Sequence, residues 1–154
     1  MIYYTALPTD IVRAYQSGAP DVYGQPAEKA VSDGRGNPCR HCLRDIPDGD
    51  SYLILAHRPF EGLHPYAETG PIFLCAEHCD RYAGNGTIPP ILSSSPEYLI
   101  KGYSAQDRIV YGTGAIVAAR DLQGKAEAIF EDSKIAYIHA RSARNNCYLI
   151  RIDR

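Results

Sequence analysis

Four of the five cysteines of this chain stand in two close pairs, and this pairing constrains the fold more than any other feature. Cys39 and Cys42 form a C-x2-C motif, and Cys75 and Cys79 form the second pair. Structural zinc takes four thiolate or imidazole ligands in a tetrahedron, and two close pairs supply them while closing only short loops. The pattern therefore predicts a structural zinc site of the zinc-knuckle type with these four cysteines as ligands.

His78 is the alternative to Cys79 as the fourth ligand, because both residues closely follow Cys75. Cys79 is favoured, since a cysteine that ends a strand and one that opens the next turn can face the same point. Two other interpretations remain open, a redox-active C-x2-C pair and buried thiols without a metal. The redox interpretation is disfavoured because a segment rich in glycine precedes Cys39, whereas that chemistry favours a helix start directly after a strand. A catalytic metal is also disfavoured, because four thiolates leave no open position for water.

Length and charge narrow the class of protein. A chain of 154 residues suits a single domain, 1–154, with a core of its own. The net charge of −2 disfavours nucleic-acid binding, which needs a basic excess. The N-terminus lacks the features of a signal peptide, and no apolar stretch approaches the length of a membrane span. We therefore expect a cytoplasmic protein without membrane contact, in which cysteines serve as ligands, redox groups or buried thiols before disulfides.

Apolar periodicity and turn residues predict an α+β fold with a mostly antiparallel sheet and a few helices. Strands are expected at 2–7, 51–57, 71–75, 97–103, 114–118, 135–142 and 146–153. The strand at 51–57 is apolar enough to be buried on both faces.

Two helices are expected, at 11–17 and at 120–133. Thr9 or Asp10 can cap the first helix, and an apolar stripe with three- and four-residue spacing supports the second. The segment 18–38 is rich in glycine, proline and aspartate and is expected to be an irregular connection.

The segment 58–70 joins two strong strands and is long enough that a functional role is expected. The candidate ligand-binding residues are Arg58, His64, Tyr66, Glu68 and Thr69, together with His139 and Arg141 near the C-terminus. These side chains can bind an anion, move a proton or hydrogen-bond a polar ligand. The alternative is structural, with aromatic residues of the loop capping the core while its polar groups brace the loop.

The last two predicted strands form a hairpin. If Asn145 and Asn146 are its two-residue turn, His139 and Arg141 share a face with the two isoleucines of the second strand. Cys147 then lies on the opposite, apolar face and is an inert core thiol. A three-residue turn would instead place His139 and Cys147 on one face and allow a nucleophile–base pair.

Several motifs together resemble one known family. They are Pro38-Cys39-Arg40-His41-Cys42-Leu43-Arg44-Asp45, Arg58-Pro59-Phe60, Pro65-Tyr66, Gly70-Pro71-Ile72-Phe73, His139-Ala140-Arg141, Cys147-Tyr148 and Arg151-Ile152. The combination is similar to a family of small bacterial proteins catalogued only as a domain of unknown function, DUF1203. The resemblance implies a bacterial, cytoplasmic, single-domain protein with a cysteine at the place of Cys79. It implies no activity, substrate or catalytic residue.

Three functions follow from these features. The favoured one is a non-catalytic, zinc-stabilised binding or regulatory module for a small anionic or polar ligand or a peptide, with no catalytic residue assigned. The second is an enzyme that uses His64, Glu68 or His139 for acid–base chemistry. The third is a redox or zinc-responsive switch through Cys39 and Cys42.

Overall fold

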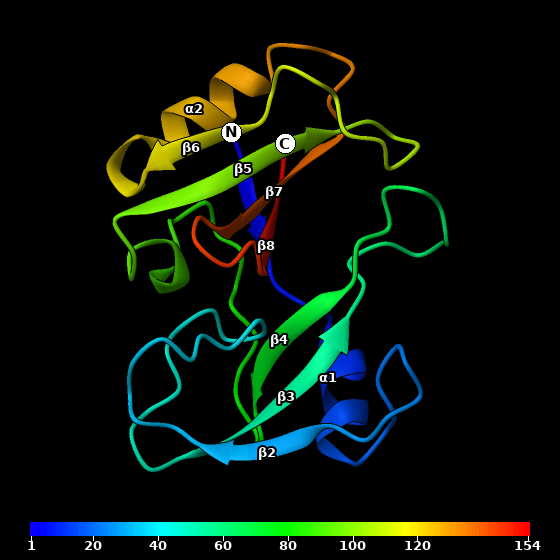
Figure 1. Cartoon of the computed structure of the whole chain (residues 1–154). Helices are drawn as coiled ribbons and strands as arrows, with labels where there is room; N and C mark the ends of the chain where they lie inside the picture. Colours follow the sequence, from blue (N-terminus) through cyan, green and yellow to red (C-terminus); the bar gives the residue numbers. More distant parts are fainter.

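Two antiparallel sheets make up the fold in the computed structural model, which describes residues 1–154 (Figure 1). The larger sheet has five strands in the order β1-β8-β7-β5-β6, and the smaller has three in the order β2-β3-β4. Every strand pair is antiparallel, which confirms the predicted α+β class. In Figure 1 the larger sheet forms the upper half of the molecule and the smaller sheet the lower half.

The strands are β1 (Tyr3–Thr5), β2 (Glu28–Val31), β3 (Ser51–His57), β4 (Gly70–Cys75), β5 (Glu97–Tyr103), β6 (Ala115–Ala118), β7 (Tyr137–Ser142) and β8 (Tyr148–Asp153). The helices are α1 (Thr9–Gln16) and α2 (Leu122–Ile129), with 3-10 turns η1 (Pro90–Leu92) and η2 (Ala119–Asp121). Neither helix combines the length and the apolarity that crossing a membrane requires.

The structure corrects three local predictions. The segment 18–38 is not wholly irregular, because it contains β2, an exposed edge strand without the apolar alternation that would have revealed it. Helix α2 is shorter than the predicted 120–133. Helix α1 is capped by neither Thr9 nor Asp10, since Pro8 occupies the N-cap and no side chain bonds there.

The smaller sheet buries only one face of β3, which corrects the prediction of burial on both faces. Leu53 and Leu55 are 4% and 3% exposed, whereas the residues between and beside them are half-buried. These leucines pack with Val12 of α1 and with Cys39 and Cys42. No second layer covers the other face of β3, so the residues that alternate with these leucines remain partly accessible to solvent.

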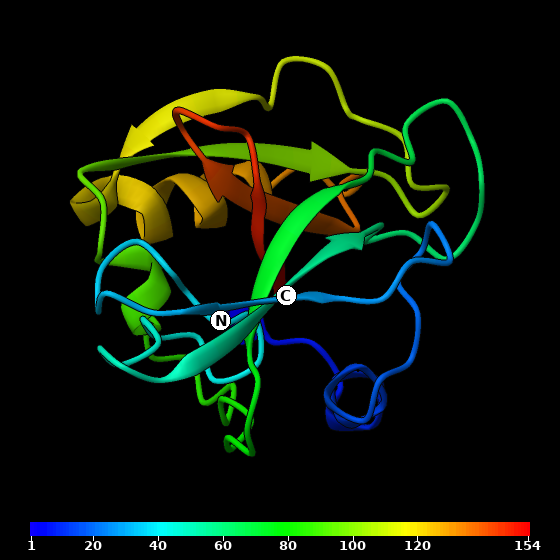
Figure 2. The ribbon, with the colours of Figure 1, turned by 60° about the horizontal axis from the view of Figure 1, so that its bottom comes forward.

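The larger sheet has two unlike faces, because neighbouring residues of a strand point in opposite directions. One face carries isoleucines that pack against α2. Figure 2 shows this helix lying against the larger sheet. The opposite face carries charged and aromatic residues from β5 and β7, namely Lys101, Tyr103, Tyr137, His139 and Arg141. This second face is also largely buried, so its polar groups are enclosed and not solvated.

The β7–β8 hairpin has a different register from the predicted one. His139 pairs with Arg151 and Arg141 pairs with Tyr148, with a β-bulge between the two pairs. His139 and Arg141 therefore share a face with Tyr148 and Arg151, and the two isoleucines of β8 lie on the other face. The predicted register is wrong because a bulge adds one residue to one strand and shifts the pairing beyond it.

The hairpin turn is also longer than two residues. The Ser142 amide donates to the Cys147 carbonyl, so four residues separate the last bonded pair. Asn146 takes the left-handed conformation that closes the turn, at φ 58°. Cys147 is half-buried beside the turn, and its Sγ lies 3.8 Å from the Asn145 carbonyl. The prediction of Cys147 as a core thiol is wrong.

Candidate functional site

The four paired cysteines meet in one cluster. Their Sγ atoms all lie within 4.8 Å of one another. Cys39 and Cys79 are 3.9 Å apart, and Cys42 and Cys75 are 4.0 Å apart. A tetrahedral ZnS4 centre with Zn–S bonds of about 2.3 Å requires S···S separations of about 3.8 Å. The cluster therefore has the shape of a four-thiolate metal centre.

The backbone of the C-x2-C segment is folded around the sulfur atoms. The amides of His41 and Cys75 both approach Cys39 Sγ at 3.4 Å. Leu43 takes the left-handed conformation, at φ 57°, and its amide closes the turn on the Cys39 carbonyl at 2.9 Å. Amides that point at a sulfur stabilise negative charge there, as a metal-binding thiolate requires.

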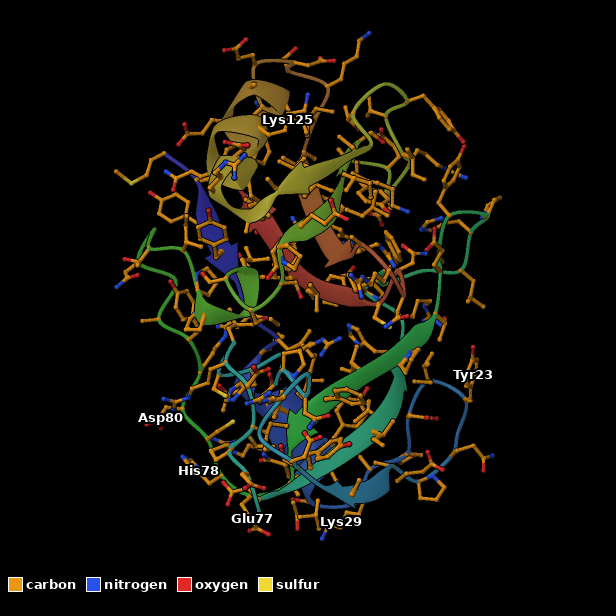
Figure 3. All side chains as sticks on the ribbon, turned by 60° about the vertical axis from the view of Figure 1, so that its left-hand side comes forward. Tyr23, Lys29, Glu77, His78, Asp80 and Lys125 are labelled. Atoms are coloured by element: carbon orange, nitrogen blue, oxygen red, sulfur yellow. The ribbon has the colours of Figure 1, made fainter.

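Cys79 and not His78 lies in the cluster. The His78 side chain is 71% exposed and pairs with Asp80, which is also exposed. Figure 3 shows His78, Glu77 and Asp80 at the outer rim of the smaller-sheet half. No helix forms directly after β4, and Cys79 returns to the cluster on an irregular segment.

The thiols do not ionise independently. Hydrogen bonding to Cys42, then to Cys75 and Cys79, lowers the pKa of the Cys39 thiol. The contact with Cys39 raises the pKa of Cys75 and, likewise, that of Cys79. Four thiolates at this spacing repel one another, and a bound dication removes that repulsion. The donor set of four sulfurs fits zinc, whose role in such a closed site is to hold the chain together.

The C-x2-C segment is also the joint between the two sheets. Arg40 lies between the two cysteines, and its Nε donates to the carbonyl of Tyr148 in β8 at 2.8 Å. The Leu7 amide donates to the Arg40 carbonyl, and the Ile91 amide donates to the carbonyl of Leu43. Leu43 itself packs into the core of the larger sheet. A metal that fixes this segment therefore fixes how the two sheets meet.

A cleft of about 930 Å³ lies where the sheets meet. It is lined by the segment from β1 into α1, by the first residues of the loop after β3, and by β7 and β8. Tyr15, Phe60, Tyr137 and Tyr148 give it aromatic walls. Its volume falls within the range of about 300–1,000 Å³ that is typical of small-molecule sites.

The charged groups of the cleft are unevenly matched. Asp107 accepts a hydrogen bond of 2.7 Å from Tyr137, and Asp153 pairs with Arg151 at 2.8 Å. Arg58 and Arg81, in contrast, donate only to backbone carbonyls, of Phe60 and Ala6, and form no ion pair. The cleft thus presents two arginines whose charge no acid neutralises.

Two histidines face the same cleft in their neutral form. Burial lowers the pKa of His57 to about 4, with the charges of Arg40 and Arg58 adding to the effect. Burial, with the nearby charge of Arg141, also holds the pKa of His139 well below its usual value. His57 Nε2 and His139 Nδ1 are buried and have no hydrogen-bond partner in the protein.

His139 sits in an aromatic cage. Its ring lies 4.7 Å from Tyr103, 5.0 Å from Tyr137, 5.0 Å from Tyr148 and 5.3 Å from Phe60, between ring centroids. Phe60, at 7% exposure, anchors the loop after β3 to this cage. Phe60 therefore plays the structural part that was the alternative for this loop, because it caps the aromatic cluster.

A second, smaller cavity of about 200 Å³ adjoins the cleft, and His57 and Tyr148 line both. Glu68, Thr69 and Arg141 line only the smaller one of these two. The seven ligand-binding candidates therefore divide, because Arg58 and His139 line the larger cleft instead.

His64 and Tyr66 line neither cavity. The His64 ring accepts a hydrogen bond from the Tyr66 amide at 3.1 Å and packs edge-on against Phe60. The Tyr66 hydroxyl meets that of Tyr111 at 3.1 Å near the surface. These two candidates brace the loop and do not face either cavity.

Comparison with models of known protein families shows to which family the chain belongs. Residues 36–154 match the model of the family described as Protein of unknown function (DUF1203). The chain belongs to this family. The DUF1203 match covers all four cysteines of the cluster and both hairpin candidates, His139 and Arg141. No curated protein and no solved structure matches the chain.

Sequence reasoning missed the contribution of α1, which precedes the DUF1203 match. Thr9 Oγ1 meets His41 Nε2 at 2.9 Å, and His41 Nδ1 lies 3.1 Å from Cys79 Sγ. Arg13 donates to the Cys79 carbonyl at 2.8 Å, and Gln16 donates to the Cys75 carbonyl at 2.9 Å. The sequence feature that could have revealed this contribution is the spacing of Thr9, Arg13 and Gln16, which places three polar side chains on one face of the helix.

Proposed function

We propose that this protein is a non-catalytic binding module, stabilised by zinc, whose cleft holds a small ligand with a negatively charged group. The single observation that carries the proposal is that Arg58 and Arg81 line the cleft without an acidic partner. Zinc in the four-cysteine cluster would hold the joint between the sheets and so maintain the cleft without touching the ligand.

The chemistry of the cleft favours an anion. A guanidinium group presents paired N–H donors that match a carboxylate or phosphate, and it binds them more strongly away from bulk water. Two acids of the cleft, Asp107 and Asp153, already accept bonds from Tyr137 and Arg151, and the third, Glu61, forms no ion pair with either arginine. The arginines therefore remain free to bind charge brought by a ligand.

The walls of the cleft favour a ligand that also has a flat or apolar part. Tyr15, Phe60 and Tyr137 line it together with Ile11. Aromatic side chains offer large contact surfaces at little entropic cost, and they pack against rings and aliphatic groups alike. Amino acids, aromatic acids, small phosphates and the C-terminus of a peptide all combine these two properties.

The histidines support binding over acid–base catalysis. A general base works best when its pKa lies near the working pH. His57, with its pKa near 4, and His139, with its pKa also lowered, are weak proton acceptors at neutral pH. In their neutral state they can instead donate or accept a hydrogen bond from the ligand.

The thiols support a cytoplasmic location as part of the proposal. All five cysteines are free, and four of them lie close enough together to hold a metal ion. Free thiols and thiolate metal sites persist in reducing surroundings such as the cytoplasm.

The test is a thermal-shift titration against a panel of amino acids, aromatic acids, small phosphates and tripeptides. We expect at least one class to raise the melting temperature in a saturable way, because a ligand that binds only the folded state stabilises it. Arg58→Gln should weaken that binding by about tenfold or more, since it removes a charge-assisted contact.

Arg120→Gln is the matched control, because it removes the same charge from a side chain that is 86% exposed and does not line the cleft. Equal affinity in the two variants, or a panel without any stabilising member, would contradict the proposal. Turnover of a bound ligand, detected by NMR and lost in His139→Gln, would decide for the enzyme interpretation instead.

A further inference from the structure

A group of charged residues lies at the smaller cavity, which Arg141 and Glu68 line directly while Lys101 lies beside them, outside its lining. Arg141 and Lys101 lie on the enclosed face of the larger sheet, with side chains that are only 4% and 14% exposed. Glu68 is the one carboxylate that pairs with both, and it is 40% exposed. Its contacts are long, at 3.3 Å to Arg141 Nη1 and 3.4 Å to Lys101 Nζ. Two enclosed cations thus share one half-exposed acid from the loop after β3.

Arg141 has donors to spare. Its Nη1 donates to the Asn146 carbonyl at 3.2 Å and faces Glu68. Its Nε and Nη2 are buried and have no partner in the protein. These two N–H groups form one edge of the guanidinium, which is the edge that binds the two oxygens of a carboxylate or phosphate side by side.

The neighbouring polar atoms are unpartnered as well. The Tyr103 hydroxyl and His139 Nδ1 are buried without a hydrogen-bond partner, and both residues lie on the same sheet face as Arg141. Buried polar atoms are paired in the great majority of cases, so unpaired polar atoms gathered on one sheet face indicate a place where a ligand can supply the missing partners. Of these three residues Arg141 lines the smaller cavity, whereas His139 lines the larger cleft.

The space beside Arg141 suits a small anion. The cavity of about 200 Å³ is lined by Arg141, Glu68, Thr69, Asn146 and Cys147. At about 30 Å³ for each water molecule, this volume accommodates a group the size of a carboxylate or phosphate with a few waters. Hydroxyl and amide groups along the wall can complete its hydrogen bonds.

We propose that Arg141 and Lys101 form a subsite for one oxyanion, a carboxylate or a phosphate, and that Glu68 occupies it as an internal partner which the ligand displaces. Because the Glu68 side chain is 40% exposed, it can rotate towards solvent without unfolding the loop. The incoming anion then takes over both ion pairs, and it can also reach donors that Glu68 leaves unused. This subsite adjoins the larger cleft, but neither Arg141 nor Lys101 lines that cleft, so the proposal does not depend on what the cleft binds.

The experiment is a titration with inorganic phosphate and, separately, with acetate, followed by NMR at constant low ionic strength. Glu68→Gln removes the competing carboxylate, and we expect it to tighten binding about fivefold. Glu131→Gln is the matched control, because it removes the same charge from an exposed residue beyond α2 and should leave affinity unchanged.

Two further variants separate this subsite from other anion sites. Lys101→Met removes one cation, and Arg141→Lys keeps the charge while removing the paired donors. Each should weaken binding by about tenfold. If Arg141→Lys fails to fold, Lys101→Met decides by itself.

The proposal is overturned if Glu68→Gln binds no tighter than Glu131→Gln, or if the variants of Lys101 and Arg141 bind as well as the natural chain. Binding of phosphate alone would assign the subsite to phosphate groups, and binding of acetate alone would assign it to carboxylates.

Discussion

Arg40 Nε donates a hydrogen bond of 2.8 Å to the carbonyl oxygen of Tyr148, and this bond ties the C-x2-C segment to β8 of the larger sheet. Arg40 is 3% exposed, and its Nη1 also donates to the carbonyl of Pro38. Tyr148 stands opposite Arg141 and lines both cavities. The four-cysteine cluster and the candidate ligand sites are therefore connected through a single buried side chain.

Replacing Arg40 by methionine is expected to weaken the joint between the sheets. The change keeps the apolar stem but removes the bonds to the buried Tyr148 carbonyl and the half-buried Pro38 carbonyl, so we expect the free energy of unfolding to fall by about 2–4 kcal/mol. Urea denaturation followed by circular dichroism measures this loss. Arg35→Met is the control, because Arg35 is exposed and lies just before the C-x2-C segment, so its loss should change stability little. Equal effects of the two variants would argue against a joint at Arg40.

Removal of the metal is expected to destabilise the domain. Four thiolates without a cation repel one another, and the segment that joins the sheets loses its fixed shape. We expect a strong chelator to lower the melting temperature by about 10 °C, which corresponds to roughly 3 kcal/mol for a chain of this size. Elemental analysis must accompany the melt, and an unchanged melting temperature after the metal has left would contradict a structural role.

The fourth ligand can be tested by a pair of neighbouring variants. Cys79→Ser should abolish stoichiometric zinc binding, because Cys79 Sγ is a member of the cluster. His78→Ala should leave zinc content unchanged, because that side chain is 71% exposed and pairs with Asp80. Mass spectrometry of the native protein reports the metal content of each variant. Retention of zinc by Cys79→Ser and its loss from His78→Ala would reverse the assignment.

His57 predicts a specific dependence of stability on pH. Its pKa is about 4 in the folded chain, against about 6.5 when unfolded, so the unfolded state binds more protons between these values. The stability that His57 contributes is complete above pH 6.5 and is lost as the pH falls towards 4. When the pH falls from 7 to 5, the free energy of unfolding of the natural chain should drop by about 2 kcal/mol more than that of the His57→Gln variant.

Chemical denaturation of both proteins at the two pH values checks this difference, with metal content held equal. A loss of the same size in both proteins would show that other groups cause the pH dependence.

Parts of the fold were accessible from local sequence. The strands at 51–57 and 97–103 agree with the structure residue for residue, because long apolar runs bounded by turn residues specify a strand whatever surrounds them. β2 escaped prediction, since an exposed edge strand takes its conformation from its neighbour and not from its own residues. The hairpin register failed at a bulge, which depends on packing between strands.

The sequence by itself determined which residues can hold a metal and where most strands run, because ligand type, close spacing and alternation are local properties of the chain. Only the tertiary structure decided that His139 and Arg141 lie on the enclosed face of the larger sheet. It also decided that α1 supports the cysteine cluster and that Glu68 pairs with two cations. Those contacts join residues far apart in the chain. They depend on which sheet faces meet, and the pattern of one segment does not encode its partner.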